Sequence, residues 1–313
     1  MDDGPVDPGR RAHYGDFYQY GDFYQHERTG EPVGVVYGNC QAESVRVALS
    51  TSPTFPVRLV RIPPVHELTA DDLPHLTSLL RDAVVLAAQP VRDDYRDLPL
   101  GTAQVSALLP PGARVVRWPV VRHHGLHPFN AIVRHPSDRS LDPPLVPYHD
   151  VRTLAEAAGL DWKPDLSPRN LRRVARQSVD DLAARETAAG VDVRVSDLLL
   201  PAGAAAAHTI NHPGNEILVA LALRLQEALG VPTDARDPGR TLLDSVHAPL
   251  LPEVVDALDL DAPPRAHWLV GGRELDDEVV RRAQLDWYRE HPLWVEAGTA
   301  RLAQRLRLLA AVR

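Results

Sequence analysis

The sequence predicts an α/β protein of three layers, in which helices flank a parallel sheet. Between residues 33 and about 120, strand-like apolar runs alternate with helix-like segments, which is typical of right-handed βαβ units. After about residue 150 the apolar spacing is helical, so we expect a mainly helical C-terminal portion. Parallel sheets bind ligands beyond the carboxyl ends of their strands, so the loops there are the first candidates for a site.

The first half of the chain supplies the predicted sheet. The run Val33–Tyr37 is apolar and predicts a buried strand, and Ala83–Ala88 has the same character. Thr69 is a suitable N-cap for the helix that follows it. We expect strands at 33–37, 57–62, 83–88 and 113–118, with helices at 41–50, 71–82 and 102–109 between them.

The second half begins with a Pro- and His-rich stretch, 119–149, which predicts an ordered loop region. Helical spacing follows, and Ile217, Leu221 and Leu225 share one face of the segment 214–229. We expect helices at about 150–159, 168–188, 214–229, 275–290 and 296–311.

Composition limits the function further. The 313 residues carry a net charge of −8, which argues against broad nucleic-acid binding. A single cysteine excludes an intramolecular disulfide and a Cys-rich zinc site. The acidic N-terminus has no apolar segment typical of a secretory signal, and no run approaches the roughly 18 apolar residues of a membrane helix. We therefore expect a cytoplasmic protein that binds neither nucleic acid nor membranes, and a homo-oligomer is compatible with the sequence.

The N-terminal segment has a character of its own. It repeats Gly-Asp-Phe-Tyr-Gln at 15–19 and 21–25, and six aromatic residues lie between positions 14 and 26. Solvated tails rarely collect so many aromatic residues, so we expect this arm to pack on the domain or on a neighbouring subunit. A flexible extension is the alternative. We divide the chain into the aromatic arm over 1–31, an α/β catalytic domain over 32–232 and a helical extension over 233–313.

The stretch Tyr37-Gly38-Asn39-Cys40-Gln41 is the most informative in the chain. Its cysteine follows the first strand and precedes a helix, which predicts a position at the carboxyl edge of the sheet. Backbone N–H groups at a helix start lower a thiol pKa and can donate to an oxyanion. A small buried core cysteine is the alternative. The strand–turn–helix setting favours a nucleophile.

A thiol nucleophile needs a base, and we select His212 from the 14 histidines. It stands just before a predicted helix, whose dipole opposes protonation and favours the neutral imidazole of a general base. A helix-cap histidine without a catalytic role is the alternative. His123, His124 and His127 suggest a metal only weakly, because no carboxylate pattern accompanies them, and we expect no metal.

Further candidates lie in the predicted loops. Gln89 follows the strand 83–88, where its amide could donate to an oxyanion. Arg92 and Arg96 come just after it, and Arg122 lies in the next loop of this kind. Guanidinium groups bind phosphate in bidentate fashion, although solvated charge is the alternative for each arginine.

These motifs resemble the WcbI family of polysaccharide-biosynthesis acetyltransferases. The resemblance rests on Gly38–Gln41 between strand and helix and on Thr209–Pro213, and Gln89 and the His127-Pro128 loop fit the same pattern. It covers residues 33 to about 230. The family implies an α/β fold related to the SGNH hydrolases, coenzyme A binding and acyl transfer to a sugar hydroxyl.

The resemblance also implies roles for individual residues. SGNH enzymes use a serine nucleophile after the first strand, so Cys40 would occupy that place. Thr209 stands where those enzymes have an aspartate, three residues before the histidine. A dyad, or an orienting group from elsewhere, is therefore expected rather than a full triad.

We accordingly expect an acyltransferase that moves an acetyl or other acyl group from coenzyme A, or from an acyl carrier protein, to a hydroxyl of a sugar or related metabolite. Cys40 would attack the thioester or place its thiolate beside the carbonyl, and His212 would deprotonate the nucleophile or the acceptor. A thioesterase or esterase with the same site, and a non-catalytic nucleotide- or glycan-binding protein, are the alternatives. The expected oxyanion and support residues are Asn39, Gln41, Gln89 and Asn211, and the expected coenzyme A-binding residues are Arg92, Arg96, Arg122 and His123.

Overall fold

The computed structural model describes residues 7–20, 31–138 and 141–311. The chain forms two compact units, and each unit combines separate stretches of sequence. The first unit comprises Met1–Val120, Ala183–Val195 and Asn215–Leu242, and the second comprises Val121–Leu182, Ser196–Gly214 and Leu243–Arg313. The division of the chain at residues 31 and 232 remains a prediction about which segments fold independently.

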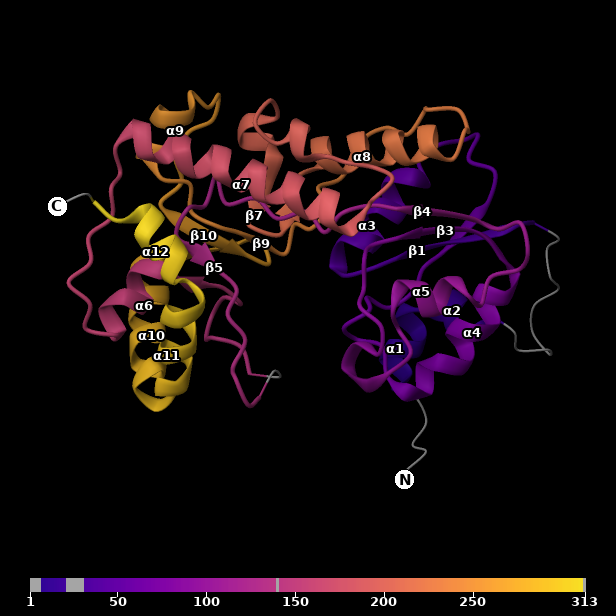
Figure 1. Cartoon of the computed structure of the whole chain (residues 1–313), viewed down its shortest axis with the longest axis horizontal. Coiled ribbons are helices and arrows are strands. Elements are labelled where there is room, and N and C mark those ends of the chain that lie inside the picture. Colours follow the sequence, from indigo (N-terminus) through magenta and orange to yellow (C-terminus); the bar gives the residue numbers. More distant parts are fainter. Residues whose placement is uncertain (1–6, 21–30, 139–140, 312–313) are drawn as a thin grey trace. The chain divides into compact units, whose positions relative to one another are not determined.

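The first unit contains a parallel four-stranded sheet in the order β2-β1-β3-β4, of which Figure 1 labels β1, β3 and β4. The central strand β1 pairs with β2 and β3, and all five of its residues are buried. The predicted parallel sheet is confirmed. The second strand is shorter than expected because it pairs only with residues 33–35 of β1. The four strands are β1 (Val33–Tyr37), β2 (Arg58–Val60), β3 (Ala83–Ala88) and β4 (Arg114–Arg117).

Helices cover both faces of this sheet. Figure 1 shows α8 on one side, where it packs against α3, and α4 and α5 on the other. α4 buries Leu76, Leu79 and Leu80 on one face, and a capping box between Thr69 and Asp72 precedes it. The expected helix at 102–109 ends early, because hydrogen-bonded turns follow residue 106. The helices are α3 (Cys40–Leu49), α4 (Leu73–Asp82), α5 (Thr102–Ser106) and α8 (Asn215–Ala228).

The described part of the aromatic arm, residues 7–20, packs on this unit through α1 (Pro8–His13) and α2 (Gly15–Gln19). Phe17 and Tyr18 are 0% and 3% exposed and belong to the same hydrophobic core as the strand β1. The expected packing is therefore confirmed for the first copy of the repeat. The second copy, at 21–25, lies outside the described residues.

The second unit combines helices with short antiparallel strands. The helices expected at 150–159, 168–188 and 275–290 are confirmed with shifted ends, whereas the one expected at 296–311 is two helices. Its helices are α6 (Val151–Ala157), α7 (Pro168–Ala189, of which residues 168–182 belong here), α9 (Pro252–Leu258), α10 (Asp277–Glu290), α11 (Pro292–Arg301) and α12 (Ala303–Leu309).

The strands of this unit were not predicted. The largest sheet is antiparallel, in the order β11-β10-β9, and its hairpin turns at Gly271 and Gly272, which both have positive φ. Glycine adopts that conformation without strain. The strands are β5 (Asn130–Ala131), β6 (His149–Asp150), β7 (Ala207–Thr209), β8 (His212–Pro213), β9 (Val246–His247), β10 (His267–Val270) and β11 (Arg273–Asp276). Across both units, 3₁₀ turns occupy Ala70–Asp72, Tyr95–Asp97, Ser196–Leu198 and Gly203–Ala206.

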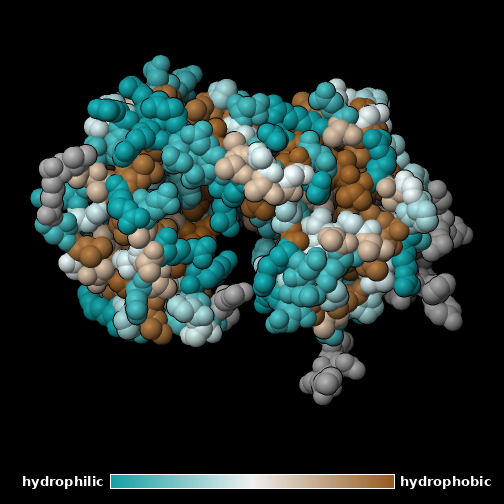
Figure 2. Space-filling view, in the orientation of Figure 1, coloured by the Kyte–Doolittle hydropathy of each residue, from teal (hydrophilic) through white to brown (hydrophobic). Residues whose placement is uncertain are grey.

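The face drawn in Figure 2 carries both hydrophilic and hydrophobic residues. On the face drawn in Figure 2, hydrophilic residues cover most of the area and hydrophobic residues form separate patches. Among the helices of the described ranges, none has both the length and the apolar composition required to cross a membrane.

Candidate functional site

Cys40 lies where β1 ends and α3 begins, as the sequence predicted. Asn39 caps the helix, because its Oδ1 accepts a hydrogen bond from the Gln41 backbone N–H at 2.9 Å. The backbone N–H groups of Cys40 and Gln41 face the sulfur and favour its charged form. The turn therefore holds a half-buried thiol beside donors that could stabilise negative charge.

Gln89 holds this turn in place. The residue follows β3, the neighbour of β1 in the sheet, and is 1% exposed. Its Oε1 accepts from the Asn39 backbone N–H at 2.9 Å. Its Nε2 donates to Gln41 Oε1 at 3.0 Å and to the Pro119 carbonyl at 3.3 Å. The structure thus brings three expected support residues together, but it engages the Gln89 amide in positioning the turn rather than leaving it open to an oxyanion.

Gly38 permits this arrangement. A Cβ atom at this position would lie 2.4 Å from Gln89 Oε1, so any larger residue would displace that side chain. The Gly38 carbonyl accepts a hydrogen bond from the Val65 backbone N–H at 2.8 Å. The turn is therefore also tied to the loop that follows β2.

The protonation state of Cys40 differs from the sequence-based expectation. Burial raises the pKa of its thiol above the ordinary value, and the negative charge of Glu67 adds to this rise. The N–H groups of Cys40 and Gln41 lower the pKa but do not outweigh burial. The expected lowering of the thiol pKa is therefore wrong for this structure, because desolvation outweighs the donors at the helix start.

His212 lies on β8, three residues before α8 begins. Burial, followed by the neighbouring His247, lowers the pKa of His212 to about 4, although carbonyls of Val246 and Leu243 oppose this effect. The imidazole is therefore neutral at pH 7, as expected, but burial is the main cause. Its Nδ1 is buried and makes no hydrogen bond to any residue that the structure describes. Cys40 belongs to the first unit and His212 to the second, so their cooperation remains a prediction.

Thr209 and Asn211 form a hydrogen-bonded group with Tyr148. The Tyr148 hydroxyl lies 2.9 Å from both Thr209 Oγ1 and Asn211 Oδ1. The Tyr148 ring meets the edge of the His212 imidazole, with centroids 6.3 Å apart. Asn211 thus supports the shape of the β7–β8 turn, and Thr209 contributes a hydroxyl at the position expected to hold an aspartate.

A carboxylate–imidazole pair that was not predicted lies near His212. His247 Nε2 is 2.6 Å from Asp244 Oδ1, and the His247 ring stacks on His208 with centroids 4.2 Å apart. The signal was present in the sequence, because Asp244 precedes His247 by three residues. His247 also lowers the pKa of His212, so it is a neighbour of that residue within the second unit.

The four residues expected to bind phosphate differ in their exposure to solvent. Arg92, Arg96 and Arg122 are exposed, and Arg96 donates to the His66 carbonyl. His123 is only 2% exposed, and burial, followed by the charge of His127, lowers its pKa to about 4. A buried, neutral imidazole offers no charge to a phosphate, so the structure argues against that role for His123.

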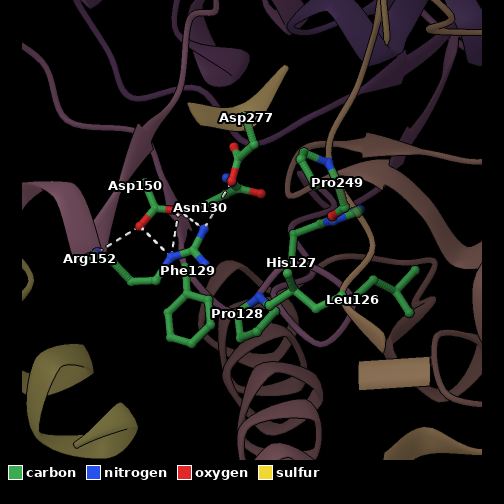
Figure 3. A pocket seen from close by; sticks show the side chains of 10 residues that line it. Leu126, His127, Pro128, Phe129, Asn130, Asp150, Arg152, Pro249 and Asp277 are labelled. Atoms are coloured by element: carbon green, nitrogen blue, oxygen red, sulfur yellow. Dashed lines mark hydrogen bonds and ion pairs between the residues drawn. The ribbon is translucent and has the colours of Figure 1, made fainter. Parts of the chain in front are cut away.

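A cavity of about 20 Å³ in the second unit is large enough for a single water molecule. Figure 3 shows Asp150 and Asp277 pointing toward the Arg152 guanidinium at its wall. Arg152 Nη2 lies 2.7 Å from Asp150 Oδ2 and 3.4 Å from Asp277 Oδ2. Arg152 thus pairs with both carboxylates, and the cavity is bordered by a structural ion-pair cluster. Within the described ranges, no three His, Cys, Asp or Glu side chains are grouped so that they could hold a metal ion.

Comparisons with known proteins show the family and the fold to which the chain is similar. The family model described as polysaccharide biosynthesis enzyme WcbI matches residues 33–234, which is more than half of the chain. A solved structure of WcbI, described as a novel polysaccharide biosynthesis enzyme, has a TM-score of 0.74 and 22% sequence identity. The match covers 89% of this chain and 99% of that one, which is described as the native protein without a disulfide bond between coenzyme A and a cysteine. No curated protein matches the chain. The family model identifies the chain as a member of the WcbI family of polysaccharide biosynthesis enzymes.

Proposed function

We propose that this protein is an acyltransferase that moves an acetyl or other acyl group from a coenzyme A thioester to a sugar hydroxyl. The observation that carries the proposal is the Cys40 turn, in which a thiol lies beside backbone donors at the carboxyl end of a parallel strand. Membership of a polysaccharide biosynthesis family supports a saccharide acceptor. We further propose that the first unit is related to the SGNH hydrolases and that the enzyme works in the cytoplasm, where a free thiol stays reduced.

The proposed reaction has two acyl transfers. In the first, the Cys40 thiolate attacks the thioester carbonyl, and the N–H groups of Cys40 and Gln41 donate to the oxyanion. The carbon–sulfur bond to coenzyme A then breaks, and the leaving thiolate takes up a proton. In the second, the acceptor oxygen attacks the acyl-Cys40 carbonyl while its proton passes to His212, and Cys40 leaves as a thiolate.

The raised pKa of Cys40 makes a base necessary in this scheme. A thiol that is protonated at neutral pH is a weak nucleophile until a neighbouring group accepts its proton. His212 is neutral at that pH because burial lowers its pKa to about 4, which leaves it free of a proton but makes it a weak base while it stays buried. We therefore assign His212 as the proton acceptor, with Asp244 and His247 as the pair that neighbours it.

Coenzyme A is the proposed donor, with an acyl carrier protein as the alternative source of the thioester. The solved WcbI structure is described with reference to coenzyme A and a cysteine, which supports a coenzyme A site in this family. The guanidinium groups of Arg92, Arg96 and Arg122 are exposed to solvent, and such groups bind phosphate in bidentate fashion.

Intact-mass spectrometry tests the proposal. After incubation with acetyl-coenzyme A, the wild-type chain should gain the mass of one acetyl group, and added acceptor should remove it. Cys40→Ser and Cys40→Ala are the matched variants. Cys40→Ala should gain nothing, whereas an acetyl group found elsewhere on the chain would exclude Cys40 as the acyl carrier.

His212 and Cys40 should also act as one unit. Groups that share a step are strongly non-additive, so Cys40→Ala and His212→Ala should each remove most of the transfer activity, and the double variant should lose little more. Losses that add in log rate would show that the two groups serve different steps.

One observation favours a second candidate, a protein that binds coenzyme A without catalysis. A thiol with a raised pKa is poorly activated, and binding alone requires no thiolate. Coenzyme A would then raise the melting temperature while no acetyl group reached Cys40 or any acceptor. Release of free acetate without an acceptor would instead identify a thioesterase.

A further inference from the structure

The N-terminal helices are fastened to the loop between β2 and α4 by Arg10. Its Nη2 donates to Asp72 Oδ2 and to the Glu67 carbonyl, each at 2.9 Å. Its Nη1 lies 3.7 Å from Glu67 Oε2. Its Nε donates to the Tyr18 hydroxyl at 2.6 Å, and that hydroxyl donates to Asp72 Oδ1 at 2.7 Å. One guanidinium group therefore joins α1, α2 and this loop.

Asp72 is the buried centre of the junction. It is 1% exposed, and burial alone would raise its pKa. Hydrogen bonds from Tyr18 and Thr69, together with the Arg10 charge, instead hold the pKa of Asp72 below its usual value. A buried carboxylate that is fully hydrogen-bonded and paired defines one geometry, so the junction orients the whole loop.

The same loop contacts the Cys40 turn. The Val65 backbone N–H donates to the Gly38 carbonyl at 2.8 Å, two residues before Cys40. Glu67 lies two residues further along the loop, and its negative charge disfavours the Cys40 thiolate. Any group that partly neutralises Glu67 should therefore favour the thiolate.

We propose that Arg10 is a positioning residue for Cys40: it orients the 65–72 loop, which contacts the Cys40 turn, and pairs with Glu67 on that loop. Arg10 precedes the segment that matches the WcbI family, residues 33–234, so this control belongs to the N-terminal arm. The inference takes its functional meaning from the proposed role of Cys40. Its test measures thiol chemistry and does not require acyl transfer.

Other charged and titratable side chains also lie around Glu67. The Tyr14 hydroxyl lies 3.4 Å from Glu67 Oε2, and His66 lies 3.9 Å from Oε1. Arg61 pairs with Glu43 at 3.3 Å and lies over the Tyr14 ring at 5.3 Å.

Two of these neighbours, Arg61 and His66, have further contacts. Arg61 also contacts His13, at 2.6 Å from its Nε2, and Arg96 donates to the carbonyl of His66. Arg10 is therefore the guanidinium that pairs with the Glu67 carboxylate within the described part of the chain.

The pH dependence of Cys40 alkylation by iodoacetamide tests the inference, because Cys40 is the only cysteine. Glu67→Gln should lower the midpoint and speed alkylation at a fixed pH by about two- to threefold, which corresponds to a partly screened charge. Arg10→Ala should raise the midpoint and slow alkylation by a similar factor, and Arg10→Lys should restore most of the rate. In the Glu67→Gln background, Arg10→Ala should have little further effect.

Arg11→Ala is the matched control. It removes one positive charge from the same helix, and Arg11 is exposed and makes no ion pair with Glu67 or Asp72 in the described residues. Its alkylation midpoint should equal that of the wild type.

An unchanged pH midpoint of Cys40 alkylation in Glu67→Gln would overturn the inference. So would an Arg10→Ala shift of the same size in the wild-type and Glu67→Gln backgrounds. A shift in Arg11→Ala as large as that in Arg10→Ala would show a general charge effect and overturn it as well. If Arg10→Ala does not fold, Glu67→Gln and Arg10→Lys still decide. None of these outcomes depends on whether acetyl transfer is detected, so failure of the proposed function is read separately.

Discussion

Gln89→Met removes the hydrogen bonds that hold the Cys40 turn while nearly preserving side-chain volume. Gln89 is 1% exposed, and its side-chain amide makes three hydrogen bonds, to the Asn39 N–H, to Gln41 Oε1 and to the Pro119 carbonyl. Methionine has a similar length and no comparable donor or acceptor, so the change tests the polar contacts rather than packing.

The expected loss of stability follows from these contacts. A hydrogen bond contributes about 0.5–1.5 kcal/mol net, and a buried group left without its partner costs about 1–3 kcal/mol. For three bonds at a buried residue we expect the free energy of unfolding to fall by about 2–4 kcal/mol. The released Asn39 N–H should also loosen the helix start, so the alkylation rate of Cys40 should change in the folded protein.

Urea unfolding and iodoacetamide labelling measure the two effects. Gln304→Met is a suitable control, because Gln304 is exposed on α12 and such a surface substitution should change stability by less than about 0.5 kcal/mol. A loss below about 1 kcal/mol in Gln89→Met, with an unchanged alkylation rate, would refute the positioning role that we assign to this amide.

Three further predictions address the turn, the histidines and the arm. Gly38→Ala should displace the same amide, because the new Cβ would lie 2.4 Å from it, and should lower the unfolding midpoint in urea. Burial lowers the pKa of His123, His127 and His149 to about 4, whereas the unfolded value is about 6.5. The unfolded chain therefore takes up protons first as the pH falls from 6.5 toward 4, and each histidine should reduce stability by about 1.4 kcal/mol per pH unit in that window; equal stability at pH 7 and pH 5 would contradict this. Deleting residues 1–30 should lower the melting temperature by several degrees in calorimetry, and an unchanged value would mean that the buried aromatic residues of the arm contribute nothing.

The elements around Cys40 could be predicted because their signals are local. The apolar run Val33–Tyr37 is buried on both faces in the parallel sheet, and Asn39 caps the following helix as its residue type favours. Gln89 was placed at the same sheet edge because it follows a neighbouring strand. Its three partners could not be predicted, since they depend on the register between β1 and β3.

The second unit shows where local signals were insufficient. The hairpin of β10 and β11 has a glycine pair at its turn, which is a hairpin signal. The helix predicted from residue 275 nevertheless overlapped β11, because α10 begins only at Asp277. Asp244 and His247 had a recognisable spacing, yet neither lies in a segment that predicted a site. His247 lies on β9, which pairs with β10, and its imidazole lies 2.6 Å from the Asp244 carboxylate in the loop before that strand.

The sequence by itself determined the parallel α/β sheet, the place of Cys40 between strand and helix, and membership of a family whose motifs it carries. These features follow from apolar periodicity, capping residues and short contiguous motifs, which act over a few neighbouring residues. Tertiary structure alone decided the charge states of the site. Desolvation raises the pKa of Cys40 and lowers that of His212, and it depends on which distant segments cover each group. The arm illustrates the same point, because its aromatic residues predicted packing, while only the folded chain shows Arg10 reaching Asp72 across 62 residues of sequence.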